Sequence, residues 1–495
     1  MSPTPMARAS SSSQRSPWAL TTAQGIIHRR HFRATKPEPI WLAVGAGCLG
    51  LYVGTRYILR AQERMRRRRE GLPVDDDDDN DSSSSASRRQ IDRILGLDFG
   101  TSNLRLATAS VMSAMPPRVI ENAEGLRATP AAVAVENDSV LVGALAKSLQ
   151  GRKPGYTATA TRLLLGQSPT GIDADDFIKS LPYKVEVQDG HVQLVLDGTS
   201  YSTEWAAEVM LDYANSVARR SFGDDGQGDD LPVVLTVPVG APEAQRAALE
   251  RVAVTAGFDV VSSIEEPVAA LHAVEKVVAE EETAEEFRGA FSGRSSGPIA
   301  VFDMGGFSSS FSILERTDST YSVLASASTT SVSGTHVDSL LFRRVIDRFY
   351  QEVGIDLSID HMASYRVLEA VEAAKVELSS RKSTDINLPF ITADRTGVKH
   401  LVQKLSTFDL SRVLESPVKD ATKLCDAVLK DAGIRKEDIG LLVLIGGGVR
   451  TEYMKTELER FFNLRAFGSK DFRPEEAVVV GATEFGRRLV LEDAS

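Results

Sequence analysis

Two aspartates in this sequence each follow a short apolar run and precede small residues. Asp98 lies in GLDFGTSN (96–103), and Asp303 lies in VFDMGGFSSS (301–310). Successive backbone N–H groups at such turns can bind an anion, while the aspartate offers a hard oxygen to Mg²⁺ or its waters. Each motif alone also fits an ordinary turn, but two together could hold a phosphate chain from opposite sides. The residues whose amides such turns expose are Gly100, Thr101, Ser102, Gly305 and Gly306.

A third carboxylate, Glu266, lies in SIEEPVAAL (263–271), where an apolar strand pattern gives way to a helical one. Pro267 suits the first turn of that helix. The carboxylate could hold a metal-bound water or cap the helix.

A glycine run and one helix face are candidates for contact with a flat ligand. LIGGGVRT (444–451) follows an apolar run, and its glycines allow a backbone to approach a ligand closely. Glu372, Lys375 and Ser379 are spaced to share one helix face, which could equally be a solvated surface. EEAVVVGA (475–482) follows later in the chain.

The elements that must position these residues alternate between strands and helices. Short apolar runs that end in turns predict buried strands, and the segment at 242–257 opens with Pro and acid and closes on Gly257, as a helix does. Such alternation indicates an α/β fold with mixed or parallel sheets. The predicted strands are 93–100, 104–110, 232–239, 298–306 and 440–448.

In this order the segments resemble the nucleotide-binding domain of the seventy-kilodalton heat-shock protein (heat shock protein 70) family, from about Arg93 to Leu489. The resemblance implies an actin-like ATPase fold of two lobes, each built on a ribonuclease-H-like sheet. Lobe I would span about 91–297 and lobe II about 298–490. ATP or ADP with Mg²⁺ would bind in the cleft, and co-chaperone or exchange-factor-like proteins are possible partners.

The resemblance also implies a role for individual residues. Asp98, Glu266 and Asp303 would surround Mg²⁺, largely through water. Arg162, Glu266 and Asp303 are the expected catalytic residues. The remaining expected nucleotide contacts are Gly100, Thr101, Ser102, Asn103, Gly305, Gly306, Phe307 and Ser308 for phosphate, and Glu372, Lys375, Ser379, Gly446, Gly447, Gly448, Arg450 and Glu475 for adenosine.

Five positions depart from the family pattern. Arg162 replaces a lysine beside the γ-phosphate, Phe307 replaces a third glycine, and Ser310 replaces a cation-holding aspartate. Val376 replaces an arginine that stacks on adenine, and His336 replaces an aspartate. The guanidinium group of Arg162 is planar and branched, whereas the lysine ammonium group is a compact charge. Phe307 would be strained if its position needed a positive φ. We therefore expect nucleotide binding with slow or absent ATP hydrolysis.

The N-terminal region, residues 1–90, differs in composition from the rest of the chain. Residues 1–37 contain five Arg and no Asp or Glu, a composition typical of an organelle transit peptide or of a disordered basic tail. The apolar run at 40–55 predicts a transmembrane helix at 38–60, although a secretory signal or a buried helix is the alternative. Charge blocks and serines at 61–90 indicate a disordered linker. The heavier positive flank follows the apolar run, which favours a mitochondrial inner membrane with the domain at 91–495 facing the matrix; endoplasmic reticulum or plastid membrane is the alternative.

Composition excludes several classes of protein. The net charge is −11, yet residues 1–70 hold thirteen Lys and Arg against three Glu, so the remainder carries about −21. An acidic folded part argues against nucleic-acid binding. The two cysteines cannot build a disulfide framework or a metal cluster.

Three functions remain open from the sequence. The first is a membrane-anchored, chaperone-related regulatory ATPase, and the second is a nucleotide-binding scaffold without turnover. A small-molecule kinase of the actin superfamily is the remote third. Only fourteen residues follow Gly481, so we expect no peptide-binding β-sandwich and no autonomous binding of unfolded peptide.

Overall fold

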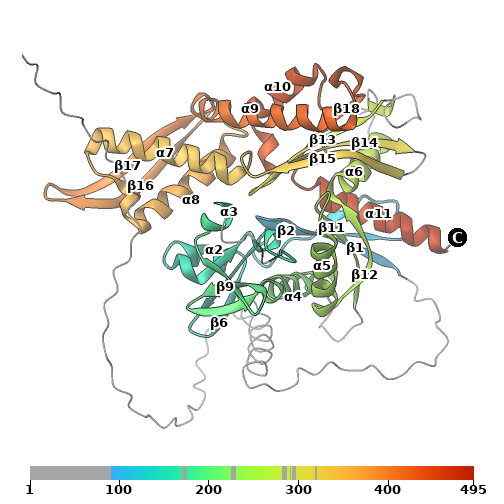
Figure 1. The fold of residues 1–495 in the computed structure, drawn as a ribbon, viewed down its shortest axis with the longest axis horizontal. Helices are drawn as coiled ribbons and strands as arrows, with labels where there is room; N and C mark the ends of the chain where they lie inside the picture. Colours follow the sequence, from blue (N-terminus) through green and yellow to red (C-terminus); the bar gives the residue numbers. More distant parts are fainter. Residues whose placement is uncertain are drawn as a thin grey trace, which may run out of the picture. The chain divides into compact units, whose positions relative to one another are not determined.

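The computed structural model describes residues 91–494 apart from residues 169, 171–175, 224–229, 281–286, 290, 292–296 and 318–319 (Figure 1). The predicted transit-like segment, membrane anchor and linker at 1–90 lie outside these described residues. Within the described ranges, no helix has both the length and the apolar character that a membrane crossing requires.

Lobe I is built on a mixed β-sheet. Its strands are β1 (Arg93–Phe99), β2 (Asn103–Ser110), β3 (Arg118–Val119), β4 (Thr129–Pro130), β11 (Leu231–Val237) and β12 (Phe258–Glu265). The order is β12–β11–β1–β2–β3, with β4 also paired to β2. β1 runs antiparallel to β2 and parallel to β11. Every β1 residue after Arg93 is buried, because this apolar run is covered on both faces.

Two small sheets and several helices complete lobe I. Their bounds are β5 (Ala132–Glu136), β6 (Ser139–Val142), β7 (Thr157–Thr159), β8 (Lys184–Gln188), β9 (His191–Leu196), β10 (Thr199–Ser202), α2 (Ala144–Gln150), η1 (Pro154–Tyr156), η2 (Thr161–Leu163), α3 (Asp176–Lys179), α4 (Thr203–Phe222) and α5 (Glu243–Thr255). The small sheets have the orders β6–β5–β7 and β10–β9–β8. α4 begins where the Ser202 hydroxyl accepts the Trp205 amide at 3.0 Å, a typical N-cap.

Lobe II repeats the plan with a second mixed sheet. Its strands are β13 (Ile299–Met304), β14 (Ser309–Thr317), β15 (Thr320–Thr329) and β18 (Leu441–Ile445). The order is β15–β14–β13–β18, where β13 is antiparallel to β14 and parallel to β18. β13 therefore occupies in lobe II the place that β1 occupies in lobe I, with a hairpin partner on one side and a parallel strand on the other.

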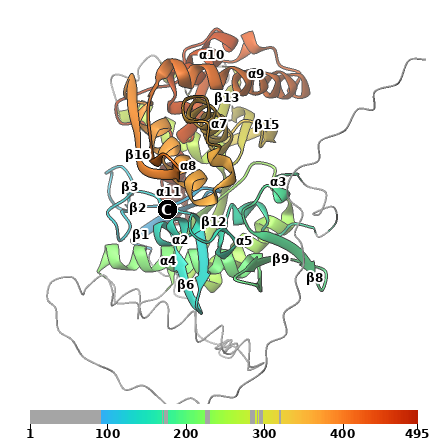
Figure 2. The ribbon, with the colours of Figure 1, turned by 90° about the vertical axis from the view of Figure 1, so that its left-hand side faces the viewer.

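Helices and a long hairpin surround the second sheet (Figures 1 and 2). Their bounds are α7 (Gly334–Val353), η5 (Leu357–Ile359), α8 (His361–Glu377), β16 (Ser383–Asp394), β17 (Gly397–Ser406), α9 (Thr407–Ala432), η6 (Lys436–Asp438), η7 (Gly447–Arg450) and α10 (Glu452–Phe462). The β16–β17 hairpin has a bulge at Phe390, whose φ is +54° although its side chain is 70% exposed. A left-handed backbone is unfavourable for a bulky side chain, so this bulge is strained.

Two helices lie between the sheets of the two lobes, as Figure 1 shows. They are α6 (Glu266–Glu280) and α11 (Ala477–Ala494). They contact each other closely, because a Cβ on Gly481 would lie 1.7 Å from the carbonyl oxygen of Ala269. Their apolar side chains share one core with β11, β13 and β18. α11 also packs on β1 and β11, so the chain returns to lobe I after completing lobe II.

The predicted strands and the helix at 242–257 are confirmed, with ends shifted by a few residues. The expected junction at Glu266 is also confirmed, since β12 ends at Glu265 and α6 begins at Glu266.

Candidate functional site

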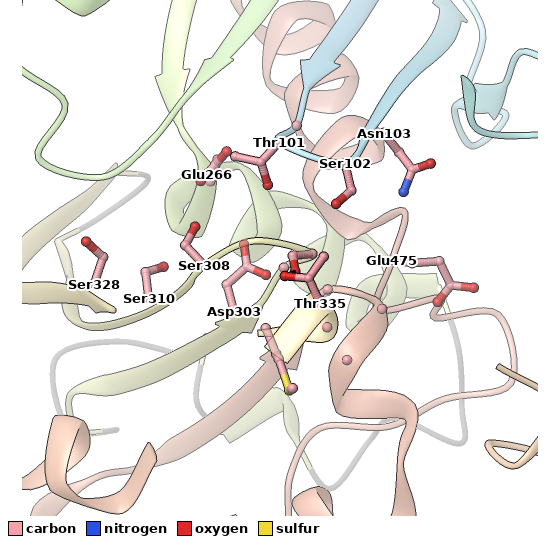
Figure 3. Close-up of a pocket in the computed structure, with 18 of the residues that line it drawn as sticks. Thr101, Ser102, Asn103, Glu266, Asp303, Ser308, Ser310, Ser328, Thr335 and Glu475 are labelled. Atoms are coloured by element: carbon pink, nitrogen blue, oxygen red, sulfur yellow. Dashed lines mark hydrogen bonds between the residues drawn. The ribbon is translucent and has the colours of Figure 1, made fainter. Parts of the chain in front are cut away.

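One cleft of about 850 Å³ gathers residues from both lobes. It contains every site residue predicted from the sequence except Phe307. Figure 3 shows Ser308, Ser310 and Ser328 on one side of Asp303 and Glu475 on the other. The predicted residues that line it are Asp98, Gly100, Thr101, Ser102, Asn103, Arg162, Glu266, Asp303, Gly305, Gly306, Ser308, Glu372, Lys375, Ser379, Gly446, Gly447, Gly448, Arg450 and Glu475.

The two aspartates occupy matching positions in the two sheets. Asp98 pairs across the β1–β2 hairpin with Arg105, and Asp303 pairs across the β13–β14 hairpin with Ser310. One strand residue separates each aspartate from the hairpin turn that follows it. The equivalent strands therefore deliver one carboxylate and one turn from each lobe to the cleft.

The glycine-rich turns contact one another where they line the cleft. A Cβ on Gly306 would lie 1.7 Å from Ser102 Oγ, so the two predicted phosphate turns leave no room for a side chain there. Gly446 has a φ of +83°, and a Cβ there would lie 2.5 Å from Asp303 Oδ1. The carbonyl of Gly306 is held by Thr335, whose amide donates at 2.8 Å and whose hydroxyl donates at 2.9 Å. Glycine is required at these positions by close approach.

Three carboxyl groups share this part of the cleft, and the pKa values of Asp98 and Asp303 are raised. Burial raises the pKa of Asp303, and the negative charges of Glu266 and Asp98 raise it further. Burial also raises the pKa of Asp98, with a further contribution from Glu266. The positive charges of Arg105 and Arg162 act against both shifts. The carboxylates therefore need cations beside them to remain ionised.

Arg162 is the most strongly constrained of these cations. Its Nη1 donates to the carbonyl of Phe99 at 2.7 Å, and its Nη2 lies 2.5 Å from Glu266 Oε1. The side chain is only 5% exposed, and its buried Nε–H has no hydrogen-bond partner among the described residues. Ala160, directly before η2, is buried with a φ of +56°. This strained turn directs Arg162 into the cleft.

Arg105 is a cleft residue that the sequence analysis missed. It lines the cleft with a side chain that is 16% exposed, and its Nη1 lies 4.0 Å from Asp98 Oδ2. Strand alternation could have identified Arg105 from the sequence, because Arg105 lies two residues after Asn103 and so shares its face of β2. Thr335, Asp338, Ser328 and Thr330 were also missed.

Charged pairs line the cleft around the predicted adenosine contacts. Lys375 Nζ lies 2.7 Å from Asp338 Oδ2 and donates to the carbonyl of Gly334 at 3.1 Å. Arg450 lies 2.6 Å from Glu475. Asp338 Oδ1 and Glu475 Oε2 are buried acceptors that lack a partner within the described part of the chain.

Two elements bridge the lobes at one edge of the cleft. Lys147 Nζ, in α2 of lobe I, lies 2.7 Å from Glu372 Oε2, in α8 of lobe II. The hydroxyl of Tyr365 donates to the carbonyl of Lys147 at 2.7 Å. Of the predicted adenosine residues, Glu372 is therefore engaged in a contact across the cleft.

The expectation for Phe307 needs correction. Its backbone does not adopt a positive φ, so the proposed strain is absent at this residue. Its ring packs edge-on against Phe177 in α3 at a centroid separation of 6.2 Å, instead of lining the cleft. The turn accepts Phe because the ring packs on α3 of lobe I and is not among the residues that line the cleft.

The carboxylates do not form a direct three-ligand metal site. Among the described residues, no group of three His, Cys, Asp or Glu side chains is placed to hold a metal ion. Glu266 Oε1 is bound by Arg162, and Asp98 Oδ1 accepts the Thr236 hydroxyl at 3.2 Å. The expected placement around Mg²⁺ through water stays a prediction.

The chain has two lobes with matching sheets, an aspartate near the end of the first strand of each sheet, and glycine turns around one cleft. These features define an actin-like nucleotide-binding domain. Comparison with known families agrees: the model of a family described as Hsp70 protein matches residues 94–490. The chain belongs to the Hsp70 family, and the resemblance stated from its motifs is confirmed.

Proposed function

We propose that this chain is a chaperone-related protein that binds ATP or ADP in its cleft and hydrolyses ATP slowly or not at all. The observation that carries the proposal is the ion pair between Arg162 and Glu266. It joins two of the three side chains, Arg162, Glu266 and Asp303, that the family resemblance implies as catalytic.

Buried polar atoms without a partner among the described residues support the proposal that the ligand is a nucleotide, and they also indicate which way it lies in the cleft. The buried Nε–H of Arg162 is a donor suited to a phosphate oxygen. Asp338 Oδ1 and Glu475 Oε2, which have no partner among the described residues, are acceptors suited to ribose hydroxyls or the adenine amino group. Leaving such groups unpaired costs about 1–3 kcal/mol each, so a ligand with phosphate at one end and a nucleoside at the other would satisfy both sets.

Slow hydrolysis follows from how the same residues are held. Charge that develops on the γ-phosphate and the attacking water must meet groups already in position. Arg162 is held by Phe99 and Glu266, and this ion pair engages Oε1 of the carboxylate expected to orient water. Ser310, opposite Asp303, supplies no carboxylate. Mg²⁺, when bound with the nucleotide, would neutralise phosphate charge.

Calorimetry and a single-turnover assay on residues 90–495 test this proposal together. We expect saturable ADP and ATP binding, with hydrolysis at least about tenfold slower than that of an active Hsp70 domain measured in parallel. No nucleotide binding would refute the proposal. Binding with no turnover at all would favour the scaffold function, whereas turnover at the rate of the active domain would refute only slow hydrolysis.

We also propose that residues 38–60 anchor the protein in a membrane, with the mitochondrial inner membrane favoured and the domain on the matrix side. The support is the apolar run at 40–55 with its positive flanks and acid-poor leader. Carbonate extraction of isolated mitochondria tests the anchor. Retention in the pellet is expected, and release of the full chain into the supernatant would contradict it.

A further inference from the structure

We propose that nucleotide binding in this cleft does not require Mg²⁺, because the guanidinium groups of Arg162 and Arg105 supply the positive charge between phosphate and carboxylates. This inference rests on the proposed nucleotide-binding function. It concerns how the cleft tolerates a polyphosphate, and it specifies the ligand class as a metal-free nucleoside di- or triphosphate.

The cleft presents a phosphate group with an electrostatic problem. Asp98, Glu266 and Asp303 all line the cleft beside the two phosphate turns. Wherever these groups are ionised, they repel a polyphosphate at the low effective dielectric of a cleft. Cations between the phosphates and these groups would relieve this repulsion.

Two cations of the chain already occupy that region. Arg162 forms an ion pair with Glu266, and Arg105 faces Asp98 across the β1–β2 hairpin. Both positive charges act on Asp98 and on Asp303. Unlike a bound ion, these groups remain when chelator removes divalent metal.

Arg162 retains hydrogen-bonding capacity for a ligand. A guanidinium group has five N–H donors. Arg162 donates from Nη1 to Phe99 and from Nη2 to Glu266, and its buried Nε–H has no partner within the described residues. Because the side chain is 5% exposed and lines the cleft, water alone satisfies this donor poorly.

Arg105 complements Arg162 near the end of β1, because Arg162 binds the carbonyl of Phe99 and Arg105 lies near Asp98. It lies on β2 beside Asn103 and approaches Asp98 no closer than 4.0 Å. This separation leaves its donors available to a phosphate oxygen, for which the planar fork is well suited. Ser308, Ser310 and Ser328 line the same cleft and add neutral hydroxyls rather than further negative charge.

Titration calorimetry with ADP and with ATP tests the inference, performed on the 90–495 protein in excess Mg²⁺ and in excess EDTA. We expect the two dissociation constants to differ by less than tenfold. A loss of tenfold or more in EDTA overturns the inference but leaves the proposed function standing. No binding in either buffer refutes both.

Variants identify the groups responsible. Arg105→Gln and Arg162→Gln should each weaken binding in EDTA by about tenfold or more, as for loss of a charged hydrogen bond, and weaken it less in Mg²⁺. Arg435→Gln is the matched control, since Arg435 forms an exposed pair with Asp438 outside the cleft. Unchanged EDTA affinity in both cleft variants overturns the assignment. If Arg162→Gln fails to fold by circular dichroism, Arg105→Gln decides the question.

Discussion

The hydroxyl of Tyr365 in α8 donates a 2.7 Å hydrogen bond to the main-chain carbonyl of Lys147 in α2, so a side chain of lobe II is tied to the backbone of lobe I. The Lys147–Glu372 ion pair adds a second tie between the same two helices. We expect a nucleotide in the cleft to leave more readily when these contacts separate.

Weakening these ties should speed nucleotide release. Both charged groups are more than a third exposed, so the ion pair contributes at most about 1 kcal/mol. Lys147→Met and Tyr365→Phe should each raise the dissociation rate of a fluorescent ADP by about two- to fivefold, measured by stopped flow. Lys423→Met, which removes an exposed pair with Asp420, is the control. Identical rates in all three variants would show that the ties do not limit release.

Restoring a compact charge and a carboxylate should increase ATP turnover. Lysine at position 162 presents a point charge without the guanidinium fork, which releases Glu266, and aspartate at 310 returns a carboxylate opposite Asp303. We expect Arg162→Lys with Ser310→Asp to raise the single-turnover rate by about tenfold or more. Arg435→Lys makes the same arginine-to-lysine change at a residue outside the cleft and is the control. A double variant no faster than the parent protein would mean that these residues are not the cause of slow hydrolysis.

Adding a side chain at Gly446 should lower the free energy of unfolding by more than its backbone angle alone explains. Gly446→Ala adds a methyl group 2.5 Å from Asp303 Oδ1 and 2.4 Å from the carbonyl of Met304, on a backbone with φ of +83°. Gly354 has a φ of +76° with nothing within 4 Å, so Gly354→Ala reports the angle by itself, about 1 kcal/mol. Urea unfolding should show a loss at least about 1 kcal/mol larger for Gly446→Ala, with nucleotide affinity reduced only there. Equal losses would contradict the close approach.

Relieving the strained bulge in β16 should stabilise the protein. Phe390 is 70% exposed, so its removal sacrifices little burial, while glycine accepts its φ of +54° freely. Phe390→Gly should raise the free energy of unfolding by up to about 1 kcal/mol. Val402→Gly, on the regular part of β17 with a 65% exposed side chain, should lower it by about 0.5–1 kcal/mol. Destabilisation of similar size in both variants would argue against strain at Phe390.

His272 should make stability depend on mildly acidic pH. It is buried between Tyr321 and Phe485, and burial together with the Arg488 and Arg316 charges lowers its pKa to about 4, although Glu275 opposes the shift. The unfolded chain binds this proton near pH 6.5 and the folded chain near pH 4, so folded-state stability falls as pH drops from about 6.5 to about 4. The loss is on the order of 3 kcal/mol.

The measurement compares His272→Gln with the parent protein in urea unfolding at pH 7 and at pH 4.5. The variant cannot take up the proton, so its stability should fall less over this interval. His361→Gln, at an exposed position, should behave like the parent protein. A parallel decline in the parent protein and in His272→Gln would exclude this group as the source.

Local patterns predicted the strands that carry Asp98 and Asp303, because a short apolar run followed by glycine specifies both burial and a turn. The same logic placed Glu266 at its helix start. The approach of these residues to one cleft was predicted only through their order along the chain, which matches the family.

The residues that were missed depend on pairing between distant segments. Arg105 lines the cleft because β2 pairs with β1 in one register, and Lys375 meets Asp338 because α8 packs against α7. The direction of Phe307 depends on Phe177, 130 residues earlier in the chain. A sequence pattern does not indicate whether such a side chain points into the cleft or packs elsewhere when its backbone allows both orientations.

The return of α11 to lobe I has a consequence for synthesis on the ribosome. β1 is among the first elements of the domain to be made, yet one of its packing partners is a helix that starts at Ala477. Until that helix has emerged, the apolar side chains of the first sheet have no complete cover, and closing a loop of nearly 400 residues is slow. A nascent chain paused within lobe II would expose this surface to aggregation. We therefore expect this surface to be exposed to aggregation until synthesis of α11 is complete.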